Sequence, residues 1–245
     1  MIQKFNRYEL KYIITLEQYH NLAHELTTYI QPDLHGDTRG RYTVTSLYYD
    51  SANYKAYWDK IEGHRYRRKV RIRIYGNPII TDETPCFVEI RERLNKSVRK
   101  RRAKLAYQAA IKLCHDGEMV TSDSPDEQKT IEEVLYLYNV LHLQPMCLVR
   151  YHRLAFNGSK YDSGLRVTFD THLTYRTHAL NMQAEQSTEN HFFLPPQRII
   201  LEVKINERVP YWLVELLGKY HCHVQAISKY CTALEQSGKY VRVEK

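Results

Sequence analysis

Lysine and arginine recur at every second position in several segments of this sequence. Residues 65–75 carry five of these cations in one such row, and residues 97–105 carry three. Alternate side chains of an extended strand share a face, so neighbouring cations in a row lie about 6.6 Å apart. The planar fork of arginine binds phosphate oxygens two at a time. This spacing predicts a surface that binds a chain of phosphate groups.

The same alternation runs through the other strand-like segments. The charged parity supplies nine candidate phosphate-binding cations: Lys11, Arg71, Arg73, Arg91, Lys100, Arg102, Arg153, Arg166 and Lys204. Four acids share these faces: Glu9, Glu89, Asp170 and Glu202. A charged face on one antiparallel strand is ordinarily a solvated outer face, but like charges on neighbouring strands repel each other. Because so many strands share the pattern, we expect a tunnel with a wet, basic interior.

The elements that must position these residues follow from composition and periodicity. Strands are expected at residues 8–14, 43–49, 65–75, 86–93, 97–105, 148–156, 165–171 and 199–205. Helices are expected at residues 15–29, 54–60, 106–115, 126–142, 210–220 and 228–236. Short connections favour antiparallel hairpins, and residues 180–190 are expected to form a polar loop. We predict an α+β fold: an eight-stranded antiparallel β-tunnel or barrel with helices packed outside, in a single domain over residues 1–245.

Composition narrows the functional classes. The chain has 36 Lys and Arg against 28 Asp and Glu, and its net charge of +8 favours anionic partners. It contains neither G-x-x-x-x-G-K nor G-x-G-x-x-G, which argues against P-loop and dinucleotide-binding folds. The five cysteines form no C-x-x-C pair, so reduced thiols are expected. Without an apolar run of about 18 residues or a signal-peptide core, the sequence predicts a cytoplasmic protein with no direct membrane span.

Aromatic residues between positions 48 and 58 have two interpretations. They could stack nucleic-acid bases, or they could pack the sheet against a helix, which is the interpretation we favour. The residues are Tyr48, Tyr49, Tyr54, Tyr57 and Trp58. Residues 50–53 are expected to cap the short helix that follows.

Several motifs, taken together and in order, resemble one protein family. They are RYELKYII, SLYYDSANYKAYWDKIEGHRYRRKVRIRIYG, FVEIRER, SVRKRRAKL, VRYHRLAF, LRVTFDT, ILEVKI and AISKY. Over residues 7–234 the chain is similar to the vacuolar transporter chaperone (VTC) domain, the polyphosphate polymerase branch of the triphosphate tunnel metalloenzymes. The resemblance implies a transferase that moves the γ-phosphate of ATP onto a growing inorganic polyphosphate chain and releases ADP.

The resemblance also implies roles for individual residues. Catalytic roles would fall to Lys11, Arg71, Arg73, Arg153, Arg166, Lys204 and Glu202. Further phosphate contacts would come from Arg91, Lys100, Arg102, Tyr151, Ser228 and Lys229. Glu202 would be the ligand of the metal cofactor, Mn²⁺ or Mg²⁺. Ser228 and Lys229 would belong to a C-terminal helix that closes one end of the tunnel.

One motif departs from the hydrolytic tunnel enzymes. Their E-x-E-x-K sequence reads Arg7-Tyr8-Glu9-Leu10-Lys11 here, so a metal ligand is replaced by a cation and synthesis is favoured over hydrolysis. The alternatives are a tunnel triphosphatase acting on inorganic or nucleoside triphosphates, and a non-catalytic module that binds polyphosphate or RNA. The strand-like alternation of residues 99–104 favours the tunnel over a specific nucleic-acid patch. A link to the inner face of a membrane would run through a membrane-protein partner.

Overall fold

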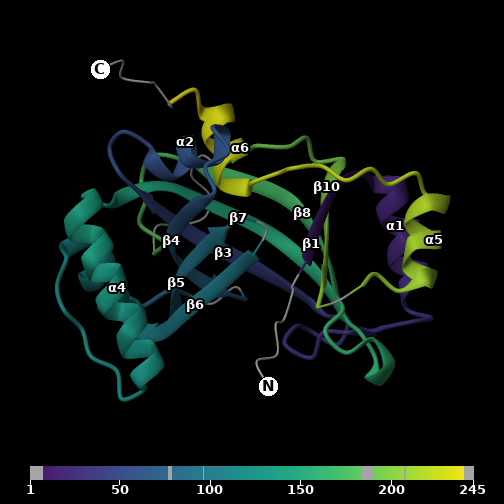
Figure 1. Cartoon of the computed structure of the whole chain (residues 1–245), viewed down its shortest axis with the longest axis horizontal. Helices are drawn as coiled ribbons and strands as arrows, with labels where there is room; N and C mark the ends of the chain where they lie inside the picture. Colours follow the sequence, from purple (N-terminus) through teal and green to yellow (C-terminus); the bar gives the residue numbers. More distant parts are fainter. Residues whose placement is uncertain (1–7, 77–78, 96, 184–189, 207, 240–245) are drawn as a thin grey trace. The chain divides into compact units, whose positions relative to one another are not determined.

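The structure, a computed structural model, describes residues 8–76, 79–95, 97–183, 190–206 and 208–239. Its eight long strands are β1 (Tyr8–Thr15), β3 (Arg41–Asp50), β4 (Tyr66–Tyr75), β5 (Pro85–Leu94), β6 (Ser97–Ala106), β7 (Gln144–Asn157), β8 (Arg166–Arg176) and β10 (Arg198–Ile205). They form one sheet in the order β1-β10-β8-β7-β3-β4-β5-β6 (Figure 1). Two short strands, β2 (Gln31–Pro32) and β9 (His191–Phe192), pair with β7 and β8. The strand pairs with a described register run antiparallel.

All the predicted helices are present. They are α1 (Leu16–Leu26), α2 (Lys55–Ile61), α3 (Tyr107–Ile111) with its π-helical continuation η1 (Lys112–Asp116), α4 (Pro125–Leu141), α5 (Tyr211–Lys219) and α6 (Lys229–Ser237). A short 3-10 helix, η2 (Lys160–Asp162), was not predicted. The predicted strands and helices together confirm the α+β class with an antiparallel sheet.

Two helix starts show why these segments fold locally. At α1, the Thr15 hydroxyl accepts a hydrogen bond from the Gln18 backbone N–H, and the Gln18 side chain accepts one from the Thr15 N–H. This reciprocal arrangement is a capping box. At α2, Asp50 accepts hydrogen bonds from the N–H groups of Ala56 and Tyr57. The cap predicted within residues 50–53 is therefore confirmed, and its main acceptor is the last residue of β3.

The chain divides into two compact units, each assembled from segments distant in the sequence. The first unit comprises Met1–Thr43, Tyr151–Leu173 and Leu194–Ile227; the second comprises Val44–Arg150, Thr174–Phe193 and Ser228–Lys245. Strands β3, β7 and β8 contribute residues to both units. A single domain over residues 1–245 stays a prediction.

The core of the second unit lies between one face of strands β4, β5 and β6 and helices α3 and α4. Strand β4 contributes its apolar parity, Val70, Ile72 and Ile74. Helix α4 contributes Ile131, Val134 and Leu137. Because side chains alternate along a strand, burial of this parity leaves Arg67, Lys69, Arg71 and Arg73 of β4 on the opposite face, as predicted.

The core of the first unit has the same design. The apolar parities of β1, β8 and β10 pack with α1 and α5; they include Tyr12, Ile14, Val167, Phe169, Leu201 and Val203. Helices α1 and α5 lie side by side over this part of the sheet (Figure 1), where Leu22 and Leu213 join the same cluster. The charged parity of these strands again faces away from the apolar core.

Some predicted connections lie outside the described residues. They are the turn residues 77–78 and 96, and residues 184–189 of the expected 180–190 loop. Residues 180–183 have neither helix nor strand, as expected of a loop. Met182, however, is buried in the core of the second unit. One end of this polar loop is therefore held by an apolar side chain.

Candidate active site

In the second unit, Arg71 and Glu89 form a buried ion pair at the centre of the basic face. They face each other in the register of β4 and β5. The Arg71 Nε and Nη2 atoms donate to Glu89 Oε2 at 2.8 and 2.6 Å, and Lys100 Nζ donates to Glu89 Oε1 at 3.3 Å. Burial raises the pKa of Glu89, but the charges of Arg71, Arg73 and Lys100 outweigh it and hold that pKa well below its usual range. Glu89 therefore stays ionised and orients the cations around it.

Tyr48 belongs to the same group of side chains. Its hydroxyl accepts a hydrogen bond of 3.0 Å from Arg71 Nη1, while the next residue of the same parity, Ser46, accepts one of 2.9 Å from Arg73 Nε. Burial alone would raise the pKa of Tyr48, but Arg71, Arg73 and Lys229 lower it to about 8. The Tyr48 ring also stacks on Tyr230 of α6, with 5.1 Å between the ring centres, so the expectation that Tyr48 packs the sheet against a helix is confirmed, while its hydroxyl lies on the basic face.

Sequence reasoning could have found Tyr48 and Ser46 from strand parity. They alternate with the core residues Leu47 and Tyr49 along β3. In the register of β3 and β4, Ser46 is opposite Arg73 and Tyr48 is opposite Arg71. Only the pairing of these two strands reveals which cations the hydroxyls meet, and that pairing is tertiary information.

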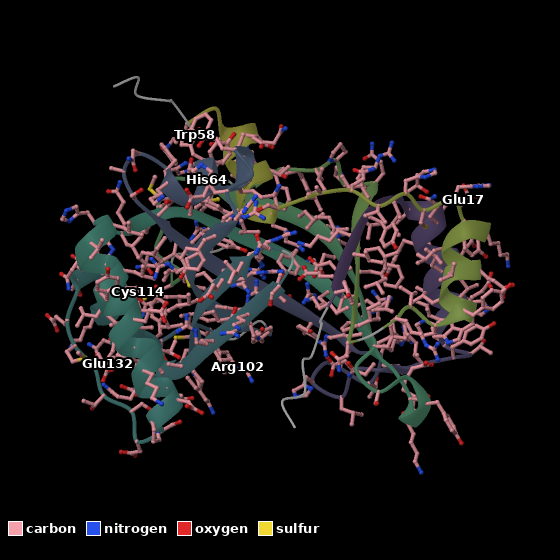
Figure 2. All side chains as sticks on the ribbon, in the orientation of Figure 1. Glu17, Trp58, His64, Arg102, Cys114 and Glu132 are labelled. Carbon is pink, nitrogen blue, oxygen red and sulfur yellow. The ribbon has the colours of Figure 1, made fainter. Side chains whose placement is uncertain are left out.

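Arg91 and Arg102 also share the basic face, and Arg102 is opposite Glu89 in the register of β5 and β6. Arg91 is opposite Lys69 on one side and Lys100 on the other. Arg102, labelled in Figure 2, is exposed. Its guanidinium lies 4.6 Å from the centre of the Phe87 ring. Both arginines belong to strands of the sheet and are accessible to a ligand.

Helix α6 brings Ser228 and Lys229 to the second unit. Ser228 caps the helix by accepting from the Cys231 N–H, and it also accepts a hydrogen bond of 3.1 Å from Lys69 Nζ. Lys229 is buried and lies close enough to lower the pKa of Tyr48. The start of α6 is therefore attached to β4, while closure of one end of a tunnel by this helix stays a prediction.

In the first unit, three cations surround Glu202, which is almost completely buried. Lys204 Nζ is 3.1 Å from Glu202 Oε2, Lys11 Nζ is 3.5 Å from Oε1, and Arg153 Nη2 is 3.6 Å from Oε2. Lys11 also lies 3.2 Å from Glu9 Oε1 and donates to the carbonyl of Ile227. A single buried carboxylate thus gathers three predicted site residues from three strands.

Arg153 has a second acidic partner, Asp170, which binds it in a bidentate pair. The Arg153 guanidinium also lies 5.3 Å from the centre of the Tyr151 ring, and Tyr151 is 1% exposed. Tyr151 therefore supports Arg153 through its ring face.

Arg166 is held by a different acid. It pairs with Asp33 and donates to the Tyr42 hydroxyl at 2.9 Å and to Asn157 Oδ1 at 3.0 Å. Burial raises the pKa of Asp33, but hydrogen bonds from His35 and the charge of Arg166 lower it to about 2. Asp33 lies in a connection just after β2, with no periodicity to mark it, so sequence reasoning missed it.

The residues of this chain could hold a divalent metal only if the phosphates of a bound substrate supplied further ligands to it. Among the described residues, no group of three or more His, Cys, Asp or Glu side chains is placed to hold a metal ion. Glu202 is a single carboxylate; beside it, Thr168 is its register partner on β8, and the buried Thr168 Oγ1 has no hydrogen-bond partner within the described part of the chain. Mg²⁺ commonly binds through one or two carboxylates plus substrate phosphates. Glu202 and Thr168 suit that arrangement and do not form a complete protein cage.

The fold and these faces define an α+β protein whose antiparallel sheet carries cation-rich faces. The family model of the VTC domain matches residues 6–237, so the chain belongs to the VTC domain family. It is 23% identical over 217 residues to vacuolar transporter chaperone complex subunit 4 of Trypanosoma brucei brucei, which covers 76% of this chain and 27% of that protein. The chain thus spans about a quarter of the length of that relative.

A solved structure supports the fold. The chain is similar to a protein of Bacillus halodurans that is provisionally described as an adenylate cyclase, with a TM-score of 0.52 and 10% sequence identity over 91% of this chain and 95% of that one. At this identity the likeness concerns the fold alone. In the residues that the structure describes, no helix has the length and apolar character needed to cross a membrane.

Proposed function

We propose that this chain is an ATP-dependent polyphosphate polymerase. Its reaction would transfer the γ-phosphate of ATP to the end of an inorganic polyphosphate chain. The terminal oxygen of that chain attacks the γ-phosphorus, the bond to the β-phosphate oxygen breaks, and ADP leaves. Membership of the VTC domain family and the likeness to a vacuolar transporter chaperone subunit support this proposal.

One structural observation carries the proposal furthest: the excess of cations on the polar face of strands β4, β5 and β6. Within these three strands, all of which the structure describes, nine cations share that face with one acid, Glu89. The cations are Arg67, Lys69, Arg71, Arg73, Arg91, Arg93, Lys100, Arg102 and Lys104. Partly buried cations of one sign are costly without counter-ions, so such a face favours a polyanion. A chain of phosphates supplies charge at the required density.

The residues would act mainly by position and charge. Phosphoryl transfer needs alignment of the reacting oxygens and neutralisation of developing charge more than it needs a protein nucleophile. Arg71 and Arg73, oriented by Glu89 and Ser46, would hold phosphate oxygens in the second unit. Lys11, Arg153 and Lys204 would do so in the first unit, where the acids Glu9, Asp170 and Glu202 orient them. Arg166, oriented by Asp33, would add a further contact.

Glu202, with the Thr168 hydroxyl beside it, would hold the metal cofactor, Mn²⁺ or Mg²⁺. When bound, such an ion neutralises phosphate charge and acts as a Lewis acid. We place the protein in the cytoplasm, at the inner face of a membrane through a membrane-protein partner. The relative's place as a subunit of a chaperone complex supports a protein partner.

Incubation of the purified protein with ATP and Mn²⁺ tests the proposed function. We expect an acid-labile phosphate polymer on a gel and release of ADP in proportion to the phosphate incorporated. Orthophosphate as the sole new product would identify a triphosphatase instead. Binding of polyphosphate or RNA without any turnover would identify a non-catalytic module.

A further inference from the structure

The basic face of the second unit continues beyond the residues assigned to phosphate transfer. Towards the β5–β6 hairpin, Arg67 of β4 stands directly opposite Arg93 of β5, two positions beyond the Lys69–Arg91 pair. Lys60 of α2 lies beside Arg67, because its carbonyl accepts a hydrogen bond from that arginine. We call Lys60, Arg67, Lys69 and Arg93 the hairpin-end cluster.

The hydrogen bonds of this cluster fix the side chains without neutralising them. Arg67 Nη1 donates to the Lys60 carbonyl at 3.4 Å, and Arg93 Nε donates to the Asn95 carbonyl at 2.8 Å. Lys69 Nζ donates to the Ser228 hydroxyl at 3.1 Å and to Cys231 Sγ at 3.2 Å. Because none of these acceptors is a carboxylate, the positive charges of the cluster remain.

Repulsion between the cations of the cluster contributes to lowering the pKa values of Arg67 and Lys60. Burial and then the charge of Arg93 lower the pKa of Arg67. Burial, together with the charges of Arg67, Lys69 and Arg93, lowers the pKa of Lys60. Cys231 and Asp59 act to raise the pKa of Arg67. Asp59 Oδ1, however, already accepts a hydrogen bond from Lys55 and contacts His64, both at 3.0 Å. Like charges opposite each other in a sheet destabilise it, so an anion at this position would relieve a cost.

The row on which the cluster lies indicates the kind of anion. Arg67, Lys69, Arg71 and Arg73 occupy one parity of β4, and the six residue-to-residue steps from Arg67 to Arg73 span about 20 Å at about 3.3 Å per step. A continuous row of this length suits an extended polyanion. The Arg71 part of the row contains the carboxylate Glu89, whereas the hairpin-end part of strands β4 and β5 places only cations on this face.

We propose that the hairpin-end cluster is a holding subsite for internal phosphates of the polyphosphate chain. Internal phosphates are retained and not transferred, so cations suffice and neither a carboxylate nor a metal is needed. The identity of this ligand depends on the proposed function, but the residues of the subsite are separate from those assigned to phosphate transfer. The proposal predicts that the affinity for polyphosphate rises with the length of the phosphate chain, because long chains reach this cluster and short ones do not.

Direct binding without ATP tests the subsite. Wild-type protein and the double variant Arg67→Ala/Arg93→Ala are titrated with tripolyphosphate and with long-chain polyphosphate at one salt concentration. Loss of a charge-assisted contact weakens binding by about tenfold. We expect the double variant to lose at least that factor on the long chain and less than about twofold on tripolyphosphate. Arg99→Ala/Lys129→Ala, which removes two exposed charges outside this face, should change neither affinity.

The melting temperature of the double variant distinguishes ligand binding from a structural role, because loss of a structural contact would lower it. Because the variant removes two cations that repel each other across the strands, its melting temperature without ligand should stay equal or rise. The single variant Arg93→Gln, at an exposed position, keeps the test valid if the double variant fails to fold.

Three outcomes would overturn the subsite. Equal losses on both chain lengths would place the cluster at the transfer site. Competition by single-stranded RNA as strong as that by polyphosphate of matched charge would make it a nucleic-acid surface. Failure of wild-type protein to bind either phosphate chain would overturn the proposed function as well, which distinguishes the two failures.

Discussion

Arg153 and Asp170 form a bidentate ion pair in the first unit, with Nε and Nη2 of the arginine each 2.7 Å from a carboxylate oxygen. Both side chains are at most 7% exposed. The same guanidinium lies 3.6 Å from Glu202 Oε2. An acid on the neighbouring strand thus sets the orientation of a cation beside the proposed metal ligand.

Asp170→Asn should weaken the fold. The amide keeps the shape of the carboxylate but leaves the Arg153 charge without its closest partner, and loss of one member of a buried pair costs about 3–5 kcal/mol. Urea denaturation measures the free energy of unfolding. The exposed Glu17→Gln on α1 is the control and should change it by less than about 0.5 kcal/mol. Equal stability of the two variants would contradict a structural role for the pair.

Glu202→Gln should abolish turnover while keeping triphosphate binding. Glutamine preserves size but loses the charge that binds a hard divalent cation, so we expect a fall of about 100-fold or more in polymer synthesis. Tripolyphosphate affinity should hold or rise because a negative charge leaves the site. Without phosphate the variant should be less stable, since Lys11, Arg153 and Lys204 lose their shared counter-ion. If this variant had the turnover of the wild-type protein at saturating Mn²⁺, the assignment of Glu202 as the metal ligand would be wrong.

Arg71→Ala and Arg73→Ala should differ in stability but not in ligand affinity. Each removes a charge-assisted phosphate contact, so tripolyphosphate binding should weaken about tenfold and depend strongly on salt. Arg71→Ala also leaves the buried Glu89 with its more distant partner Lys100, at 3.3 Å, and should cost about 3–5 kcal/mol of unfolding free energy. Arg73→Ala should cost less. Unchanged affinity in both variants, measured by calorimetry, would place this face outside the binding site.

Tyr48→Phe should remove a pH dependence near pH 8. The pKa of Tyr48 is lowered to about 8, so above that pH a tyrosinate forms among the cations and repels phosphate. Wild-type tripolyphosphate affinity should therefore fall as the pH rises from about 7 to about 9, and fall less in the variant. A profile identical in both proteins would show that Tyr48 stays protonated.

The same ionisation should affect folding in the opposite direction. An acid whose folded pKa lies below its unfolded value, about 10 for tyrosine, adds stability as the pH rises from about 8 to about 10. Below about pH 8 this contribution is lost. Urea denaturation of wild-type protein and Tyr48→Phe over this range measures the difference.

The alternation of side chains along the strands allowed much of this protein's structure to be predicted from the sequence alone. Burial of Val70 and Ile72 requires that Arg71 and Arg73 face the other way, because alternation along a strand is local geometry. The same reasoning correctly placed Glu202 and Lys204 opposite Leu201 and Val203. The eight strands, the helices and the cation-rich face were therefore predictable before any contact was known.

Only the tertiary structure decided which charges meet. Strand pairing sets Glu89 opposite Arg71 and puts Tyr48 on the other side of the same arginine. The chain segment after β2 delivers Asp33 to Arg166 from 133 residues away. Register and loop placement depend on the packing of distant segments, and no local pattern encodes them. The sequence thus indicated a face for phosphate, while the fold determined which acids orient its cations.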